Sequence, residues 1–435
     1  MKKIHHYFAL IIISYLYGIL SFKYDLFPAP QFRFIVSQAR LALNEFSDNK
    51  SWYFIEANER KRVPIYIKNE VQPGLTLITG LSNERTMSIK AINFEGESIH
   101  NWDIDWYKIW PDSNHIPAHL IPKGKPGTHI HGSKVTQNGG VLFNFENLGF
   151  VHLDACGNTV FKVSYPTHHA IEEDENGDYW LPGQIYHQEP LAQYPNYIPP
   201  FKDDTIVKIS KQGKVLFEIS IMDVLKKNGY SGLMYLSTLK SRNTQVSGDI
   251  YHLNDVELFP NSMDEGTFKH GDVMVSLRNI NTVFVFDPKT LKIRYLTTGK
   301  FVRQHDPDFI DGDHFSVFDN NHIAPSEYGQ NSKIVIVSAI DDQVQDYFSS
   351  ADKVPFYTNI MGKHQWLENG NLLMLESMNG RVIEVNTQKE VVWSYNNLLT
   401  GGKLISIMEG AHRLPVTYNK NFFKLAMSQC KIENY

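Results

Sequence analysis

The chain has very little cysteine: Cys156 and Cys430 are the only two among 435 residues. Two cysteines so far apart cannot form the disulfide framework of a small secreted domain, and their spacing matches no cysteine metal motif. A single disulfide between them is compatible with the sequence. Because Cys156 lies in the turn Asp154-Ala155-Cys156-Gly157, we assign it no function.

A strong charge of either sign is also missing. The formal net charge is -5, and no dense run of lysine and arginine occurs. Proteins that bind nucleic acids normally carry such runs, so we expect no nucleic-acid partner. The length of 435 residues fits either two or three ordinary domains or one large closed β architecture.

Long apolar runs are absent except near the N-terminus. Lys2 and Lys3 precede an apolar stretch from Tyr7 to Phe22, which is typical of a secretory leader. The stretch of about 16 residues is slightly shorter than the roughly 20 that span a bilayer. Residues 1–30 therefore fit a signal peptide or a signal anchor, and we favour an anchor through residues 7–22. The two lysines predict a cytoplasmic N-terminus and an extracytoplasmic, periplasmic remainder.

The organisation changes near Pro73. Residues 31–72 are predicted to be a linker or juxtamembrane segment, with a short helix or linker from Gln31 to Asn49. From Pro73 onward, short apolar or aromatic runs alternate with Gly, Asn and Asp turns, which is typical of β structure. We therefore expect one all-β domain over residues 73–435.

A hairpin signature recurs along this β region. An apolar residue and a polar one lead through a short turn into a strand that usually ends in an aromatic residue. The six hairpins start at Ile92-Asn93, Leu153-Asp154, Ile209-Ser210, Phe286-Asp287, Ile340-Asp341 and Val385-Asn386. Their spacing of 45 to 77 residues favours a β-propeller with one four-stranded blade per hairpin.

A histidine precedes a turn and an apolar run in one segment after another. These histidines are His131, His169, His252, His305 and His364, with an enlarged loop from Pro260 to Lys269 following His252. We expect each to start the innermost strand of a blade and to face the central axis. The first hairpin lacks such a strand, so Gly410 to Leu414 is predicted to supply it and to close a six-bladed ring. The competing folds are a β-sandwich array or two jelly rolls.

Three clusters combine a histidine with other polar side chains: Thr167-His168-His169-Ala170-Ile171, His252-Leu253-Asn254-Asp255 and Gln304-His305-Asp306. Arg278 ends the apolar run before it. An arginine and several imidazoles suit an anion such as sulfate or phosphate, and one imidazole can act as nucleophile. Three histidines also suit zinc, with Asp255 and Asp306 as outer carboxylates. Arg278 would repel a dication, so we favour the anion.

These motifs, in this order, resemble the bacterial aryl-sulfate sulfotransferases, a family of six-bladed propellers. The resemblance covers roughly residues 75 to 415. The matching boxes are His168-His169-Ala170-Ile171, His252-Leu253-Asn254, Ser276-Leu277-Arg278, Gln304-His305, Phe318-Asp319-Asn320, Leu367 to Leu372 and Gly380 to Val385. The chain departs from the family pattern at Ala170, where the family has Asp, and at Leu277, where it has Ser. Too few residues precede Pro73 for the family's N-terminal sandwich domain.

The resemblance implies sulfuryl transfer from an aryl sulfate donor to a phenol acceptor, with no cofactor and no metal. Carried over by position, His305 is the nucleophile that becomes transiently sulfated. His252 and Arg278 bind the sulfuryl oxygens, and His169 binds the sulfuryl group or assists proton transfer. We expect the neighbouring His168, Asn254, Gln304 and His364 to contact the substrate.

Two alternatives follow from the same residues. A propeller that has lost catalysis would bind an anionic ligand or a partner protein outside the cytoplasm. A metal-dependent hydrolase or lyase would use the histidine ring to hold its metal.

Overall fold

The computed structural model describes residues 2–24, 53–82, 86–116, 120–238, 245–323, 331–352 and 354–430. The chain forms two compact units, Met1–Trp52 and Tyr53–Tyr435. The helix or linker predicted from Gln31 to Asn49 lies outside the described residues.

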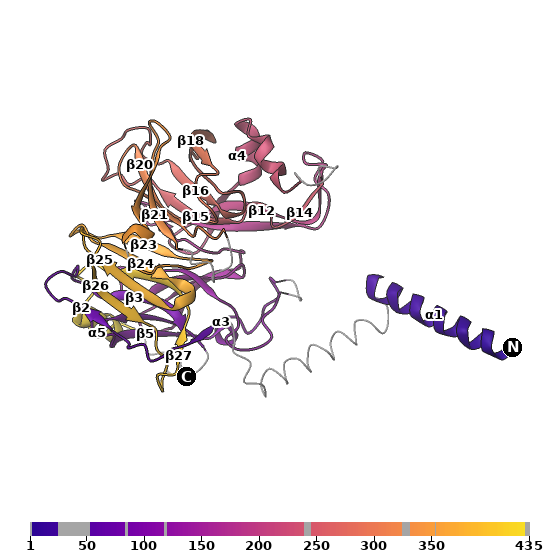
Figure 1. Ribbon diagram of the computed structural model, residues 1–435, viewed down its shortest axis with the longest axis horizontal. Coiled ribbons are helices and arrows are strands. Elements are labelled where there is room, and N and C mark those ends of the chain that lie inside the picture. The colour runs from indigo at the N-terminus through magenta and orange to yellow at the C-terminus, as the bar shows by residue number, and fades with distance from the viewer. Residues whose placement is uncertain are drawn as a thin grey trace. The chain divides into compact units, whose positions relative to one another are not determined.

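The second unit is a six-bladed β-propeller, and each blade is built on four antiparallel strands (Figure 1). From the axis outward, the strands are β28 (Met408–Arg413), β3 (Thr76–Leu81), β4 (Met87–Ile92) and β5 (Ser98–Ile104) in the first blade, β6 (Ile130–Val135), β7 (Val141–Phe145), β8 (Gly149–Leu153) and β9 (Thr159–Val163) in the second, and β10 (Glu172–Glu173), β11 (Tyr179–His187), β12 (Tyr197–Ile209) and β13 (Val215–Ser220) in the third. They continue with β15 (Leu253–Leu258), β16 (Val273–Leu277), β17 (Thr282–Asp287) and β18 (Lys292–Thr298) in the fourth, β19 (His305–Phe309), β20 (His314–Asp319), β21 (Lys333–Ser338) and β22 (Val344–Phe348) in the fifth, and β23 (Lys363–Trp366), β24 (Leu372–Glu376), β25 (Arg381–Val385) and β26 (Val391–Asn396) in the sixth.

Smaller elements decorate the ring. The additional strands are β1 (Phe54–Glu56), which pairs with β27 (Leu404–Ser406), β2 (Ile65–Tyr66), which pairs with β26, and β14 (Val246–Gly248), which pairs with β12. The helices of this unit are α3 (Trp106–Ile109), α4 (Ile221–Lys227) and α5 (Lys420–Ser428), and its 3-10 turns are η1 (Ser231–Thr238), η2 (Arg278–Ile280), η4 (Ser350–Asp352) and η5 (Ser377–Asn379).

The last strand of the chain closes the ring. β28 pairs antiparallel with β3, with Arg413 opposite Thr76 and Met408 opposite Gly80. The stretch from Gly410 to Leu414, predicted to close the first blade, overlaps this strand, so the predicted closure is confirmed. Closure pairs a strand edge that would otherwise stay exposed.

Hydrophobic cores fill the spaces between neighbouring blades. In β16, Val273 and Val275 pack toward the third blade, while Met274 packs toward the fifth. This alternation follows from strand geometry, because successive side chains point to opposite faces. Both faces are buried, so strands such as β16 and β17 are nearly continuous apolar runs.

The six predicted hairpins form the third and fourth strands of the six blades. The predicted start of the β domain at Pro73 differs from the structure. Residues 53–72 were assigned to the linker, yet they belong to the same compact unit as the blades, where β1 and β2 pair with strands near the C-terminus. Strands of two or three residues are too short to leave a recognisable pattern in the sequence.

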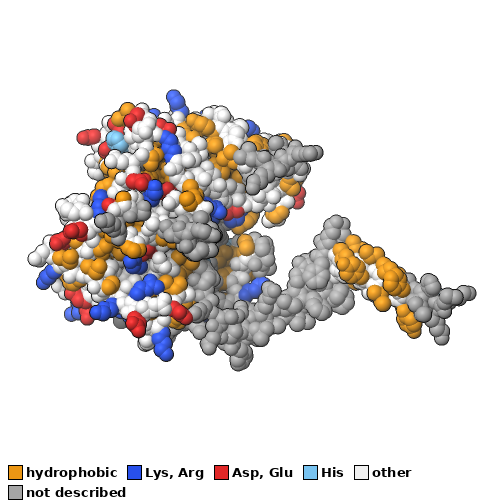
Figure 2. Space-filling model, viewed as in Figure 1, with side chains coloured by type: hydrophobic (Ala, Val, Ile, Leu, Met, Phe, Trp, Pro, Cys, Tyr) orange, Lys and Arg blue, Asp and Glu red, His pale blue; other side chains and the backbone are white. Residues whose placement is uncertain are grey.

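Helix α1 (Lys2–Tyr24) forms most of the described part of the first unit. Its apolar side chains are largely exposed, between 61 and 70% for Tyr7, Phe8, Ile11, Ile13 and Tyr15 (Figure 2). Among the residues that the structure describes, no helix is both long and apolar enough to cross a membrane. The anchor predicted through residues 7–22 is therefore not shown.

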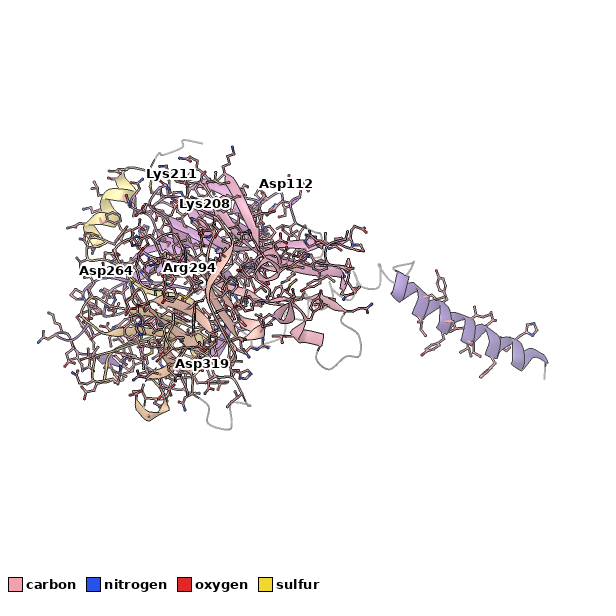
Figure 3. The ribbon with its side chains drawn as sticks, turned by 90° about the horizontal axis from the view of Figure 1, so that it is seen from above. Asp112, Lys208, Lys211, Asp264, Arg294 and Asp319 are labelled. Carbon is pink, nitrogen blue, oxygen red and sulfur yellow. A yellow bond between two sulfur atoms is a disulfide. The ribbon has the colours of Figure 1, made fainter. Side chains whose placement is uncertain are left out.

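Ion pairs link strands on the outside of the blades. Lys208 Nζ on β12 lies 2.7 Å from Asp174 Oδ2, and Arg294 Nε on β18 lies 2.6 Å from Asp272 Oδ2 (Figure 3). The side chains of Lys208, Asp174 and Arg294 are partly exposed, whereas that of Asp272 is buried.

The two cysteines form a disulfide, although the sequence suggested no function for Cys156. The Cα atoms of Cys156 and Cys430 are 6.2 Å apart, and the bond joins the turn between β8 and β9 to the second residue after α5. Phe423 of α5 is buried and stacks on His100 of the first blade. The disulfide and this packing together hold the segment that follows the closing strand.

We predict that breaking this disulfide destabilises the propeller without unfolding it. Cys430→Ser should lower the free energy of unfolding by about 2–4 kcal/mol, because the unfolded chain loses a cross-link over a long loop. Denaturant titration of the wild type and the variant, with and without reductant, measures this. Reductant should lower the unfolding midpoint of the wild type to that of the variant and leave the midpoint of the variant unchanged. Equal midpoints for oxidised and reduced wild type would contradict the prediction.

Candidate active site

The inner strands begin with irregular backbone at the axis. Register shifts interrupt four of them: between His131 and Ser133, Leu253 and Asp255, His305 and Asp308, and Met408 and Gly410. His169 and His252, just before their strands, have positive φ angles of +54° and +56°. A left-handed conformation costs about 1–2 kcal/mol for such residues. Strain of this kind concentrates at functional sites.

Gly132 allows the second and third blades to meet closely. Its φ is +66°, and a Cβ atom there would lie 1.7 Å from the carbonyl oxygen of His169. Only glycine fits at this contact. The close approach places the ring centroids of His131 and His169 4.5 Å apart.

His305 is buried and held in one tautomer. Its Nδ1 lies 2.7 Å from Asn320 Oδ1, and Asn320 Nδ2 donates to the carbonyl oxygens of Thr358 and Met361. Because the amide nitrogen is committed to carbonyls, Asn320 Oδ1 must accept, and His305 Nδ1 must donate. Nε2 of His305 then carries the lone pair, and it has no hydrogen-bond partner among the described residues.

The surroundings of His305 keep its ring neutral. Burial, followed by the positive charge of Arg278, lowers the pKa of His305 to about 3. His252 and Lys363 act in the same direction. At neutral pH, His305 is therefore an uncharged imidazole with a free nucleophilic nitrogen.

Arg278 and His252 are tied together by backbone and charge. The Arg278 amide donates to the carbonyl oxygen of His252 over 3.1 Å. Nδ1 of His252 lies 2.6 Å from Asp249 Oδ2, which fixes Nδ1–H as the donor. Burial and the neighbouring Arg303 lower the pKa of Arg278 to about 10, so its guanidinium stays charged at neutral pH. The Arg278 Nε is buried and lacks a hydrogen-bond partner among the described groups.

His169 connects the two sides of the site. Its ring centroid lies 5.6 Å from that of His252, and its Nδ1 lies 2.8 Å from Nδ1 of His168. Burial and then His131 lower the pKa of His169 well below its usual value. The structure thus brings His169, His252, Arg278 and His305, predicted from separate motifs, into one electrostatic neighbourhood, with His168 behind His169.

The other predicted residues have different surroundings. Asn254 lines the same cavity as His305, and its Nδ2 donates to the Gln304 carbonyl over 2.7 Å. The side chain of Gln304 is buried and donates to Ser276 and Thr282 of the fourth blade. The side chain of Gln304 therefore packs against the fourth blade and is not part of the cavity lining.

His364 belongs to a second axial cluster. Its fully buried ring contacts Asp306 Oδ2 through Nδ1 at 3.2 Å and Ser316 Oγ through Nε2 at 2.7 Å. Lys363 beside it pairs with Asp306 and lies 3.7 Å from Asp255 Oδ1. Burial alone would lower the pKa of Lys363, but the carboxylates of Asp255 and Asp306 outweigh burial and raise it. Lys363 thus stands between the carboxylates and the imidazoles.

A small cavity joins these groups. Its volume is about 20 Å³, enough for about one water-sized group. Its lining includes His131, His169, Asn254, His305 and Lys363.

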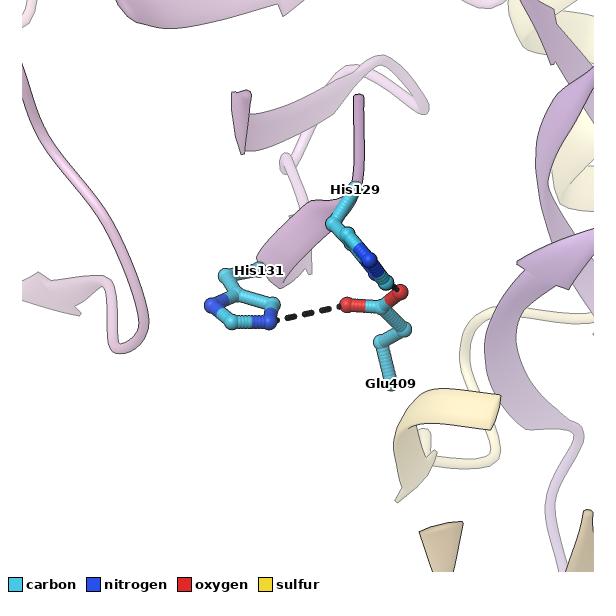
Figure 4. A group of neighbouring side chains, drawn as sticks. All are labelled: His129, His131 and Glu409. Atoms are coloured by element: carbon cyan, nitrogen blue, oxygen red, sulfur yellow. Dashed lines mark hydrogen bonds and ion pairs between the residues drawn. The ribbon is translucent and has the colours of Figure 1, made fainter. Parts of the chain in front are cut away.

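Several residues of the site were missed in the sequence. Asn320 and Asp249 orient His305 and His252, and Asn320 stood inside the Phe318-Asp319-Asn320 box without being assigned a role. Glu409 on β28 contacts both His129 and His131, with Glu409 Oε2 3.0 Å from His131 Nε2 (Figure 4). A single glutamate 280 residues from His129 in the chain gives no local signal.

Three groups of described side chains have donor atoms within 4.8 Å of one another: His129, His131 and Glu409; Asp306, Asp308 and His364; and Asp154, Cys156 and Cys430. In the first two, these atoms already bond to one another or to Lys363, and in the third the cysteines form a disulfide. His169, His252 and His305, which suggested zinc in the sequence, do not form such a group among the described residues.

Comparison with known proteins gives one family match. The arylsulfotransferase (ASST) family pattern covers residues 133–398, more than half of the chain. No curated protein matches the chain. Among solved structures, a protein of unknown function from Bacteroides caccae is similar with 13% identity and a TM-score of 0.48, over 77% of this chain and 98% of that one. Virginiamycin B lyase from Staphylococcus aureus is similar with 12% identity and a TM-score of 0.35, over 67% and 86%.

The matched region spans from the first strand of the second blade into the sixth blade, and it includes His169, His252, Arg278 and His305. The propeller fold, the ordered motifs and this match lead to one conclusion: the chain belongs to the arylsulfotransferase (ASST) family.

Proposed function

We propose that the protein transfers a sulfuryl group from an aryl sulfate to a phenol through a transiently sulfated His305. The observation that carries this proposal is the state of His305. Its Nδ1 donates to Asn320, its ring is neutral, and its unpartnered Nε2 belongs to a residue that lines the axial cavity. Family membership supports the reaction class.

The reaction runs in two displacements. His305 Nε2 attacks the sulfur, the bond between sulfur and the aryl oxygen breaks, and its electron pair leaves with that oxygen, which takes up a proton. The acceptor phenol then loses its proton and its oxygen attacks the same sulfur. The N–S bond breaks, and its electron pair returns to Nε2. No cofactor and no metal enters either step.

Arg278 and His252 supply the electrostatics. A sulfuryl group is anionic, and Arg278 offers a charged, partly desolvated guanidinium whose Nε has no partner among the described side chains. His252 Nε2 becomes a donor only when the ring takes up a proton, which a bound anion favours. Removing one such donor from a transition state typically slows the reaction by about 10²–10³-fold.

His169 and the remaining polar residues complete the site. His169 and Asn254 line the cavity beside His305, and the Asn254 Oδ1 is buried without a partner among the described residues. We assign substrate contacts to both, with His168 fixing the ring of His169. Gln304 and His364 hold the inner strands in place and act through the residues they support.

We also propose that the protein works outside the cytoplasm. The Cys156–Cys430 disulfide fits an oxidising compartment such as the periplasm. The N-terminal apolar segment would then direct export, as a cleaved signal or a retained tether. A non-catalytic propeller that only binds an anion, and a metal-dependent enzyme, remain as outcomes of the assays below.

We predict that His305→Ala abolishes transfer. Purified protein is incubated with 4-nitrophenyl sulfate and a panel of phenols, and phenol release is followed by absorbance. The rate of phenol release by the variant should be lower by about 10⁴-fold or more, because only residual activity survives removal of a covalent nucleophile. With sulfur-labelled donor and rapid quenching, wild-type protein should carry label on His305. His412→Gln, which changes an exposed histidine of the closing strand outside the proposed machinery, is the matched control. If His305→Ala turns over the donor at the wild-type rate, His305 is not the nucleophile.

A second prediction concerns pH. Since the pKa of His305 is lowered to about 3, protonation of the nucleophile should not limit kcat/KM until the pH approaches that value. Asn320→Asp places a carboxylate against Nδ1, which favours the imidazolium and raises the pKa of His305. The acidic limb of the kcat/KM profile should therefore move to higher pH in this variant. Thermal unfolding controls for folding, and an unmoved limb in a folded variant would contradict the role of Asn320.

A further inference from the structure

The wall of the cavity holds a histidine–glutamate pair that the proposed reaction has not used. His131 lies on β6, and Glu409 lies on β28, the strand that closes the ring. The Nε2 of His131 is 3.0 Å from Glu409 Oε2, and the Glu409 side chain is only 1% exposed. His129 Nδ1 contacts the other carboxylate oxygen (Figure 4). His131, Glu409 and His305 line the same cavity.

The pKa of His131 is shifted in the opposite direction to the pKa values of the other histidines that line the cavity. Burial would lower the pKa of His131, but the carboxylates of Glu146 and Glu409 outweigh burial and raise it, against a smaller opposing effect of Lys363. Burial would also raise the pKa of Glu409, yet His129 and His131 lower it to about 2. His169 and His305 have lowered pKa values. Among these cavity-lining histidines, His131 is the one that favours the imidazolium.

One donor of this imidazolium is unused. A protonated imidazole carries an N–H on both ring nitrogens. Nε2 of His131 faces Glu409 Oε2 at 3.0 Å, whereas Nδ1 of His131 is buried and has no hydrogen-bond partner among the described residues. In Figure 4, Nδ1 faces away from Glu409. A buried donor without an acceptor is destabilising, and a substrate oxygen at this position would satisfy it.

We propose that His131 is the acid–base catalyst of the sulfuryl transfer and that Glu409 is its positioning residue. This inference rests on the proposed function. As the S–O bond breaks, the aryl oxygen takes the proton from His131 Nδ1 and leaves as a neutral phenol. The neutral His131 keeps its Nε2 beside Glu409. When the acceptor phenol attacks the sulfated His305, His131 Nδ1 takes the phenolic proton, and the pair returns to its starting state.

The role defines the class of substrate. An acidic phenol leaves readily as its anion, so it gains little from a proton donor. A weakly acidic phenol, with a pKa of about 10 like that of tyrosine, needs the proton. The protein is therefore suited to sulfate esters of unactivated phenols, and to phenols of the same kind as acceptors.

A comparison of leaving groups tests the proposal. We would measure kcat/KM for 4-nitrophenyl sulfate and for phenyl sulfate with wild type, His131→Asn and Glu409→Gln. In both variants, kcat/KM for phenyl sulfate should fall by about 10²–10⁴-fold, which is the usual contribution of acid–base catalysis. The kcat/KM for 4-nitrophenyl sulfate should fall far less. His412→Gln, on the same strand as Glu409, should keep the wild-type ratio of kcat/KM for the two esters.

A pH profile provides a readout that a structural role would not move. With phenyl sulfate, wild-type kcat/KM should fall as the pH rises through the raised pKa of His131, because the acid loses its proton. In Glu409→Gln that limb should move to lower pH, and NMR titration of the His131 ring should show the same shift. Among the described residues, further titratable groups around His131 are Glu146, Lys363, His129, His168 and His169.

The outcomes separate the two proposals. If wild type turns over neither ester, the proposed function fails and the role of His131 falls with it. If wild type is active but both variants lose activity equally for both esters, or lose none, the acid–base role is overturned while the sulfuryl transfer stands. Stoichiometric metal in wild type that disappears in Glu409→Gln would assign the cluster to a metal centre instead and would equally overturn the role.

Discussion

The pairing of β28 with β3 is the constraint on which the rest of the propeller depends. Six blades share their cores pairwise, so every blade has two buried faces only if the ring is complete. Closure also brings the six inner strands to one narrow axis, where their polar side chains are crowded together. Each of these side chains either pairs with another group or is buried without a partner. The arrangement of charge at the axis follows from this crowding.

At the axis, charge divides into two zones. Asp306 pairs with Lys363 and contacts His364, and Asp255 Oδ1 lies 3.7 Å from Lys363 Nζ, whereas His169 and His305 line the cavity together with Lys363. Lys363 lowers the pKa of His305 and stabilises the ionised form of Asp306. The neutral imidazoles and the guanidinium of Arg278 thus form a region with little negative charge of its own, which suits an anionic ester. The carboxylates of Asp249 and Glu409 are committed to His252 and His131.

Local patterns predicted the blades well, because a hairpin is determined by residues close together in the chain. The turns after His131, His169, His305 and His364 separate first from second strands as expected. Partners from distant segments left no such pattern. Asn320 reaches His305 across a strand pair, and Glu409 reaches His129 across the closure. The disulfide has the same origin, since only the docking of α5 brings Cys430 near Cys156.

The position of Glu409 on the closing strand has a consequence for biosynthesis. All residues from His129 to Lys363 are translated before β28 exists, so the earlier blades form an open arc until that strand is made. During that interval His131 lacks its carboxylate, and the axial cavity lacks one of its walls. The complete axial cavity therefore forms last, in the same event that closes the ring. A chain that is cut before Met408 lacks Glu409 and cannot complete this cavity.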